Sequence, residues 1–141
     1  MTSDWILQIQ NNIPELTRVH AWLEEIRTTH AIGGGDVFAL TLALDELLTN
    51  TISYGYDDTA SHDITVTLRV DDGRAHVCID DDAREFDPLR AEKPDIDAPL
   101  EERRIGGLGI HLVTTMMDRV EYRREGGHNI IRLEKVLNPE A

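Results

Sequence analysis

The sequence predicts an α+β fold, a two-layer α/β sandwich in which helices cover one face of a mixed, mostly antiparallel sheet. Several short segments alternate between apolar and polar residues, as half-buried strands do. Two longer segments before residue 55 carry apolar residues at helical spacing. The predicted order is strand, helix, helix, two strands, loop, helix, two strands. The 141 residues fit a single domain over 1–141.

The first part of the chain is expected to form one strand and two helices. Residues 5–10 alternate between apolar and polar side chains, which predicts the first strand. Pro14 opens a helical segment with an apolar stripe. Three glycines at 33–35 interrupt this pattern, and Asp36 is predicted to be the N-cap of a second helix over 37–54.

The remainder is expected to form two hairpins, a long loop and a helix. Asp71-Asp72-Gly73 and Gly126-Gly127 are typical of hairpin turns, because glycine accepts the positive φ that such turns require. Residues 80–105 are polar and contain three prolines, so we expect a loop there, with a lid over about 84–105. The predicted elements are strands over 64–70 and 75–79, a helix over 106–118, and strands over 120–123 and 130–136.

The net charge of −13, from 27 acidic and 14 basic residues, limits the partners of this chain. A surface of this sign repels nucleic acids and anionic membranes, so we expect neither as a direct partner. An anionic nucleotide would need a metal ion, backbone N–H groups or well-placed arginines. Cys78 is the only cysteine and is expected to be a small core residue. The sequence shows no N-terminal signal and no apolar run near 18 residues, which predicts a cytoplasmic protein.

Glu46 and Asn50 lie one turn apart on the second predicted helix. They share a stripe with Ala39 and Ala43, two small residues that could leave room for a ligand. Mg²⁺ prefers oxygen ligands and takes few protein groups, so Asn50 is a candidate metal ligand. Glu46 is a candidate base or holder of a metal-bound water. An ordinary amphipathic helix with both residues at its solvent boundary would show the same pattern.

Two further segments carry candidate ligand-binding residues. Residues 80–82 are aspartates at the end of a predicted strand, where a carboxylate could accept a hydrogen bond from the amine of adenine. A solvated acidic turn is the alternative. Gly106-Gly107-Leu108-Gly109 opens a predicted helix, whose free N–H groups and dipole favour phosphate, although a flexible turn would look the same. Arg103 and Arg104 precede this loop and could reach a terminal phosphate.

In this order, the motifs resemble the Bergerat ATP-binding fold of the histidine-kinase-like ATPases. The likeness is strongest to the bacterial anti-sigma-factor serine/threonine kinases, and it rests on four segments: LALDELLTNTISYGY, DDDAREFDP, RIGGLGIHLVTTMMDRVEY and GGHNIIRLEK. It extends from about residue 10 to residue 137 and therefore implies this fold for nearly the whole chain.

The resemblance implies roles for residues at both ends of a nucleotide site. It makes Glu46 the catalytic glutamate, Asn50 the Mg²⁺ ligand and Asp81 the adenine-binding aspartate. The nucleotide-binding positions expected from motif and resemblance together are Asn50, Asp81, Ala83, Arg104, Gly107, Leu108, Gly109 and Ile110. Ala83 departs from the family pattern, because a glycine is expected there, and alanine costs roughly 1 kcal/mol if φ is positive. Arg132 also departs, because the last strand often has Thr or Ser near the adenine.

The resemblance also implies a function. It implies ATP and Mg²⁺ as cofactors, phosphorylation of a serine or threonine on a small anti-sigma-factor antagonist, and sequestration of a sigma factor. Family members often dimerise, so a homodimer is a further expectation. The alternative is a regulatory module that binds a protein partner without phosphorylating it. Ala83 and Arg132 favour this alternative, because both depart from the pattern at the adenine end.

Overall fold

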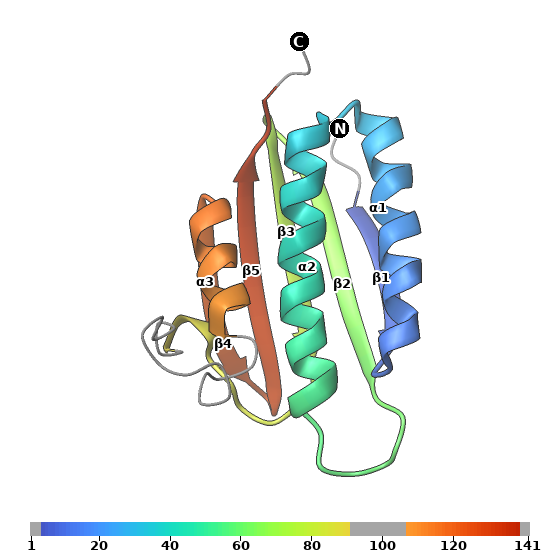
Figure 1. Cartoon of the computed structure of the whole chain (residues 1–141), viewed down its shortest axis with the longest axis vertical. Coiled ribbons are helices and arrows are strands. Elements are labelled where there is room, and N and C mark those ends of the chain that lie inside the picture. The colour runs from blue at the N-terminus through green and yellow to red at the C-terminus, as the bar shows by residue number, and fades with distance from the viewer. Residues whose placement is uncertain (1–3, 91–106, 139–141) are drawn as a thin grey trace.

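Helices cover one face of a five-stranded sheet in the computed structural model, which describes residues 4–90 and 107–138 (Figure 1). This is the two-layer α+β sandwich that the sequence predicts. The strands are β1 (Asp4–Gln10), β2 (Asp63–Asp71), β3 (Arg74–Asp81), β4 (Arg119–Glu125) and β5 (His128–Val136). The helices are α1 (Leu16–His30), α2 (Gly34–Tyr54) and α3 (Gly107–Met116), with short 3₁₀ helices η1 (Ile13–Glu15) and η2 (Pro88–Arg90).

The strands follow the order β1-β2-β3-β5-β4, and each neighbouring pair is antiparallel. The described sheet is therefore antiparallel throughout. The turns between β2 and β3 and between β4 and β5 each have two successive residues with positive φ: Asp72 and Gly73 at 52° and 71°, and Gly126 and Gly127 at 58° and 80°. Two positive φ angles in a two-residue loop match the twist of the flanking strands. Because glycine favours such φ angles, both hairpin turns can be located from the sequence.

The start of α2 differs from the prediction. The helix begins at Gly34 with Gly33 as its N-cap, so Asp36 is not the capping residue. Asp36 instead lies in the first turn, where a carboxylate is favourable near the positive end of the helix dipole. Its Oδ2 accepts a hydrogen bond from the backbone N–H of Asn138 at 2.7 Å. Asp36 therefore ties the chain after β5 to α2, a contact that local capping rules do not anticipate.

The apolar core lies between the sheet and the helices. α2 crosses the middle of the sheet (Figure 1). It contributes Leu44 and Leu48, and β2 contributes Ile64 and Leu68, all fully buried. Because side chains alternate along a strand, the other row of each strand faces away from the helices. Cys78 belongs to that partly exposed row of β3, so the expectation of a core cysteine is wrong. Among the described residues, no helix has the length and apolarity needed to cross a membrane.

Candidate nucleotide site

Glu46 on α2 and Gly109 on α3 are in contact, although they are far apart in the sequence. A Cβ atom at position 109 would overlap the Glu46 carboxylate, with the Glu46 Cδ 2.5 Å away and Cγ 3.1 Å away. Only glycine therefore leaves the Glu46 side chain in this place. The contact joins the predicted catalytic carboxylate to the first turn of α3, where the predicted phosphate loop ends.

Asn50 lies one turn after Glu46, and both side chains are half-buried. The alanines of the same stripe do not leave an open cleft as expected, because Ala39 and Ala43 are 4% and 1% exposed and belong to the core. Within 4–90 and 107–138, no three or more His, Cys, Asp or Glu residues could together hold a metal. A carboxamide oxygen suits Mg²⁺, which keeps mostly waters and phosphate oxygens as ligands. The half-buried Asn50 carboxamide therefore has the chemistry to serve as a protein ligand of a Mg²⁺ ion that arrives with a nucleotide.

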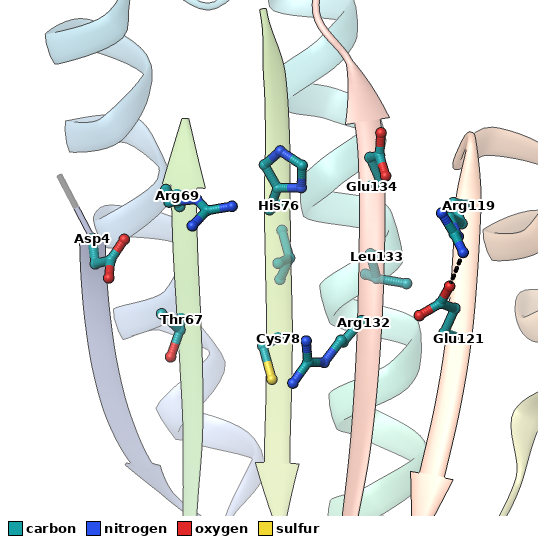
Figure 2. A pocket seen from close by; sticks show the side chains of 11 residues that line it. Asp4, Thr67, Arg69, His76, Cys78, Arg119, Glu121, Arg132, Leu133 and Glu134 are labelled. Atoms are coloured by element: carbon teal, nitrogen blue, oxygen red, sulfur yellow. Dashed lines mark ion pairs between the residues drawn. The ribbon is translucent and has the colours of Figure 1, made fainter. Parts of the chain in front are cut away.

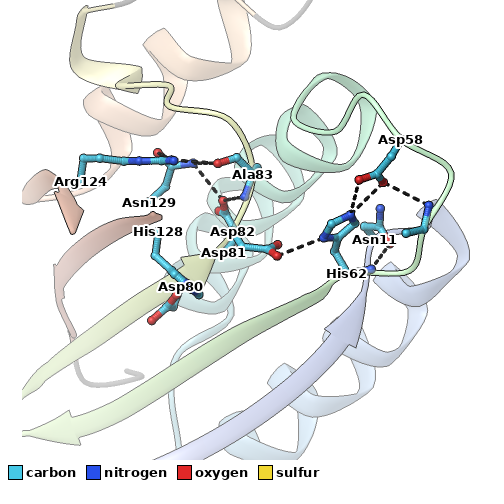
Figure 3. A network of polar contacts seen from close by, with 11 residues as sticks. Asn11, Asp58, His62, Asp80, Asp81, Asp82, Ala83, Arg124, His128 and Asn129 are labelled. Carbon is cyan, nitrogen blue, oxygen red and sulfur yellow. Dashed lines mark hydrogen bonds and ion pairs between the residues drawn. The ribbon is translucent and has the colours of Figure 1, made fainter. Parts of the chain in front are cut away.

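Asp81 is the last residue of β3 and is only 1% exposed, on the side of the sheet that the helices cover. Its Oδ1 accepts hydrogen bonds from the Ala83 N–H at 3.1 Å and from Asn129 Nδ2 at 3.0 Å (Figure 3). Burial raises the pKa of the Asp81 carboxyl above its usual range, and the two hydrogen bonds oppose that rise. Since both bonds that the described residues donate to this carboxylate end on Oδ1, Oδ2 is the oxygen that they leave for an outside donor. This arrangement suits a base that carries an exocyclic amine.

Asn129 on β5 organises the surroundings of Asp81 and is not among the site residues predicted from the sequence. The side chain is 4% exposed and uses both ends of its carboxamide. Its Nδ2 also donates to Arg84 O at 2.9 Å and to Ala83 O at 3.4 Å. Its Oδ1 accepts from Tyr122 Oη at 2.6 Å, Arg124 Nη1 at 3.1 Å and the Phe86 N–H at 3.3 Å. One side chain therefore connects β3, the segment after β3 and β4. In the sequence, Asn129 alternates with Ile131 and Leu133, and this spacing indicates that its side chain is buried on the same face of the strand.

Arg132 does not lie beside Asp81, contrary to the expectation. The β3–β5 register pairs Asp81 with Asn129 and pairs Arg132 with Cys78. Because Arg132 is an odd number of residues from Asn129, its side chain points to the other face of the sheet. There it lines a hollow of about 510 Å³ on the face away from the helices (Figure 2). The sheet separates this hollow from Glu46 and Asp81, so the Arg132 side chain lies away from the predicted nucleotide site.

Ala83 adopts an unstrained backbone, since it is not among the residues with positive φ. The expected cost of alanine in place of glycine therefore does not arise from the backbone. Its methyl group is buried, with the residue 3% exposed, against Gly55 at the end of α2. A Cβ at position 55 would lie 2.8 Å from the Ala83 Cβ and 2.5 Å from the Thr51 carbonyl oxygen. Glycine at 55 thus makes room for alanine at 83.

The other predicted ligand-binding positions lie at or before the start of α3. The helix begins at Gly107, which leaves the N–H groups of its first turn without partners inside the helix. Ile110 is 5% exposed and packs in the core, so its backbone and not its side chain would face a phosphate. Arg104, the side chain of Leu108 and the lid from residue 91 onward lie outside the described residues.

A family model described as the histidine kinase-like ATPase domain matches residues 9–135. This range includes the Glu46–Gly109 contact and the Asp81–Asn129 pair. The chain therefore belongs to the histidine kinase-like ATPase domain family, as its motifs predict.

Within this family, the chain is similar to bacterial protein kinases. It is 30% identical to the serine/threonine-protein kinase BtrW of Bordetella bronchiseptica over 120 residues, 85% of this chain and 84% of BtrW. It is 29% identical to the serine-protein kinase RsbW of Halalkalibacterium halodurans, with 65% of this chain and 58% of that kinase covered. For RsbW of Listeria monocytogenes the identity is 29%, with 70% and 65% covered. The chain thus spans less than two thirds of the two RsbW proteins. These relatives confirm the resemblance to the anti-sigma-factor kinases.

Two solved structures share the fold. The RsbU and RsbW domains of a Mycobacterium tuberculosis protein superpose with a TM-score of 0.69 at 13% identity, over 99% of this chain and 33% of that chain. A blue-light activated histidine kinase of Erythrobacter litoralis gives a TM-score of 0.53 at 18% identity, over 88% of this chain and 41% of that chain. The likeness supports the histidine-kinase-like fold and extends to no residue role.

Proposed function

We propose that this protein is an ATP- and Mg²⁺-dependent serine/threonine protein kinase that acts as an anti-sigma regulatory factor. The observation that carries the proposal is the contact between Glu46 and Gly109. It places a carboxylate, which can act on a hydroxyl, next to a glycine at a helix start, where a phosphate can bind. Family membership and the similarity to kinases such as BtrW support the same reaction class.

Phosphoryl transfer requires mainly positioning and stabilisation of charge. In the proposed mechanism, Glu46 orients the hydroxyl of the protein substrate and accepts its proton, while the hydroxyl oxygen bonds to the terminal phosphorus of ATP and ADP leaves. Asn50 would hold a Mg²⁺ ion, which would neutralise charge on the transferring phosphate. The N–H groups at the start of α3 hold phosphate oxygens, and Gly109 lets the backbone come close to Glu46. Each role uses a residue of α2 or α3, so the packing of these two helices sets the geometry.

The adenine end is proposed to lie at Asp81. The carboxylate is buried and held through Oδ1, which leaves Oδ2 to accept a hydrogen bond from the exocyclic amine. Asn129 fixes the orientation of this carboxylate by donating from Nδ2.

The proposed protein substrate is a serine or threonine on a small anti-sigma-factor antagonist, and the proposed second partner is a sigma factor. The relatives are named serine or serine/threonine kinases, which supports the hydroxyl substrate. The net charge of −13 favours partner surfaces that carry basic patches. The proposal includes a homodimer as the assembly that meets these partners.

The direct test is transfer of labelled phosphate from ATP to a candidate antagonist protein. Glu46→Ala should reduce the transfer rate by about 100-fold or more, because general-base and positioning contributions are of that size. Asp45→Ala is the matched control, since Asp45 is the preceding residue of α2 and pairs with His20 at 2.7 Å. Equal rates for wild type and Glu46→Ala, or no transfer by the wild type, would contradict the kinase proposal.

A second function is carried by one observation, the buried methyl group of Ala83 where the family has a glycine. A regulatory module that holds its partner without phosphorylating it would need no nucleotide. Calorimetry with Mg-ADP and Mg-ATP discriminates between the two. No heat and no thermal shift at millimolar nucleotide would favour the module. Saturable binding with a Kd below the millimolar range would favour the kinase.

A further inference from the structure

A second polar cluster lies at the same end of the sheet as Asp81, on the segment that joins α2 to β2 (Figure 3). His62 stands between two carboxylates there. Its Nε2 is 2.8 Å from Asp58 Oδ1, and its Nδ1 is 3.0 Å from Asp82 Oδ2. The His62 side chain is only 20% exposed. Because Asp82 directly follows Asp81, the cluster reaches the proposed adenine end through one peptide unit.

The geometry selects the protonated form of His62. A neutral imidazole donates one hydrogen bond only, and its second nitrogen would present a lone pair to a carboxylate, whereas an imidazolium donates both. The hydrogen bond to Asp82, followed by the one to Asp58, raises the pKa of His62 above its usual range. The hydrogen bond from His62 lowers the pKa of Asp58. Partial burial raises the pKa of Asp82, but the bond and charge of His62 outweigh it, and that pKa is lowered.

The remaining group against the His62 ring is Tyr56. The two rings are stacked with centroids 4.4 Å apart and planes 23° apart, an arrangement in which a cation is attracted to the aromatic face. The Tyr56 hydroxyl is buried and has no hydrogen-bond partner among the described residues. Burial, followed by the charges of Asp81 and Asp82, raises the pKa of Tyr56, so the phenol stays neutral. Within 4–90 and 107–138, the charged groups that contact His62 are therefore the carboxylates of Asp58 and Asp82.

His62 and Asp82 belong to two segments that are also joined elsewhere. The Arg84 N–H donates to the Gly55 carbonyl at 2.9 Å, and Arg84 forms an ion pair with Asp57 at 3.4 Å. These contacts connect the end of α2 to the turn after β3. Since α2 carries Asn50 and the turn follows Asp81, the metal end and the adenine end of the proposed site meet at this junction.

We propose that His62 is a positioning residue of the nucleotide site, whose doubly bonded ring fixes the turn after Asp81, so that nucleotide binds more tightly when His62 is protonated. This inference rests on the proposed function, because it assumes that Asp81 receives the adenine. Loss of the proton removes one of the two hydrogen bonds and releases either Asp58 or Asp82. The affinity is therefore highest at a pH below the pKa of His62 in the free protein and falls as the pH rises through that pKa.

Calorimetric titration of the full chain with Mg-ADP between about pH 6 and pH 9 tests the inference. For the wild type, Kd should rise roughly three- to tenfold over this range, in addition to any change that the protonation of ADP itself causes. His62→Gln should bind more weakly than wild type at pH 6 and should lose this additional rise. His20→Gln is the matched control, because His20 on α1 also pairs with an aspartate, Asp45 on α2, at 2.7 Å. The inference is overturned if His62→Gln retains the pH dependence of the wild type.

A second measurement needs no nucleotide. In an NMR titration of the free protein, the His62 ring signals and the backbone amides of Asp82 to Arg84 should share one pKa, and Asp82→Asn should lower that pKa. Amides that do not respond as His62 titrates would overturn the inference, whether or not nucleotide binds. Wild-type protein that binds no Mg-ADP at any pH would instead overturn the proposed function. The amide spectra of the variants also show whether each variant is folded.

Discussion

Replacing Asp81 by asparagine should separate nucleotide recognition from stability. Asp81 is 1% exposed, and its two hydrogen bonds both end on Oδ1. The asparagine oxygen can accept the same two bonds. The atom at the Oδ2 position, however, changes from an acceptor to a donor and would meet the exocyclic amine of adenine, which is also a donor. The substitution therefore removes recognition of the base while keeping the protein contacts of the turn.

The expected magnitude follows from the type of bond that is lost. A hydrogen bond to a charged group contributes about 1.5–3 kcal/mol, so Kd for Mg-ADP should rise roughly 10- to 100-fold. Stability should respond in the other direction. Burial raises the pKa of Asp81, so the ionised carboxyl destabilises the fold at neutral pH. That cost is absent below the unfolded-state pKa near 3.9 and develops as the pH rises through the higher folded-state pKa. Asp81→Asn should therefore have an equal or higher Tm at pH 7.

The assay compares Mg-ADP with Mg-IDP by calorimetry. IDP has a carbonyl oxygen where ADP has the amine, so wild type should prefer ADP, and Asp81→Asn should lose or reverse this preference. Asp80→Asn is the matched control, because Asp80 is the adjacent residue of β3, lies on the opposite face of the strand and pairs with His128 at 2.6 Å. An unchanged ADP/IDP ratio in Asp81→Asn would refute the assignment of Asp81 to the adenine.

Three further substitutions test the packing around the site. Gly109→Ala should displace Glu46 and reduce phosphate transfer at least about tenfold. The free energy of unfolding should change little, because alanine gains about 1 kcal/mol of helix propensity over glycine. Unchanged transfer by a folded variant would contradict the contact. Gly55→Ala should lower the free energy of unfolding in urea by about 1–3 kcal/mol, and adding Ala83→Gly should recover part of the loss; strict additivity of the two changes would argue against the contact. Asn129→Ala should lower the free energy of unfolding by about 1–3 kcal/mol or more in the same assay, because it leaves buried partners unpaired. A loss below about 0.5 kcal/mol, the size typical of surface substitutions, would contradict its role.

The strands and hairpins could be predicted because their signals are local. The alternation that predicts a strand over 64–70 also determines which of its side chains are buried. Asp72 and Gly73 make the intervening turn with positive φ, which glycine allows at no cost. Sequence spacing on α2 likewise places Glu46 and Asn50 on one stripe. In these cases each local preference agrees with the final fold.

The adenine end could not be predicted as well, because it depends on strand register. Asp81 can be placed by counting along a motif, but the residue opposite it is set by the pairing of β3 with β5. Asn129 and Arg132 are three residues apart on β5, so their side chains point to opposite faces of the sheet. The fit of Ala83 to Gly55 is also a tertiary contact between the end of α2 and the turn after β3. A single sequence holds no local signal for either contact.

The structure of the complex with Mg-ADP would show whether α2, the start of α3 and the end of β3 form one nucleotide site. We expect the adenine amine on Asp81 Oδ2, the metal ion on the Asn50 carboxamide oxygen and phosphate oxygens at the N–H groups of the first turn of α3. Nucleotide bound in the hollow beside Arg132 on the open face of the sheet, or a metal ion without Asn50 as a ligand, would contradict this expectation.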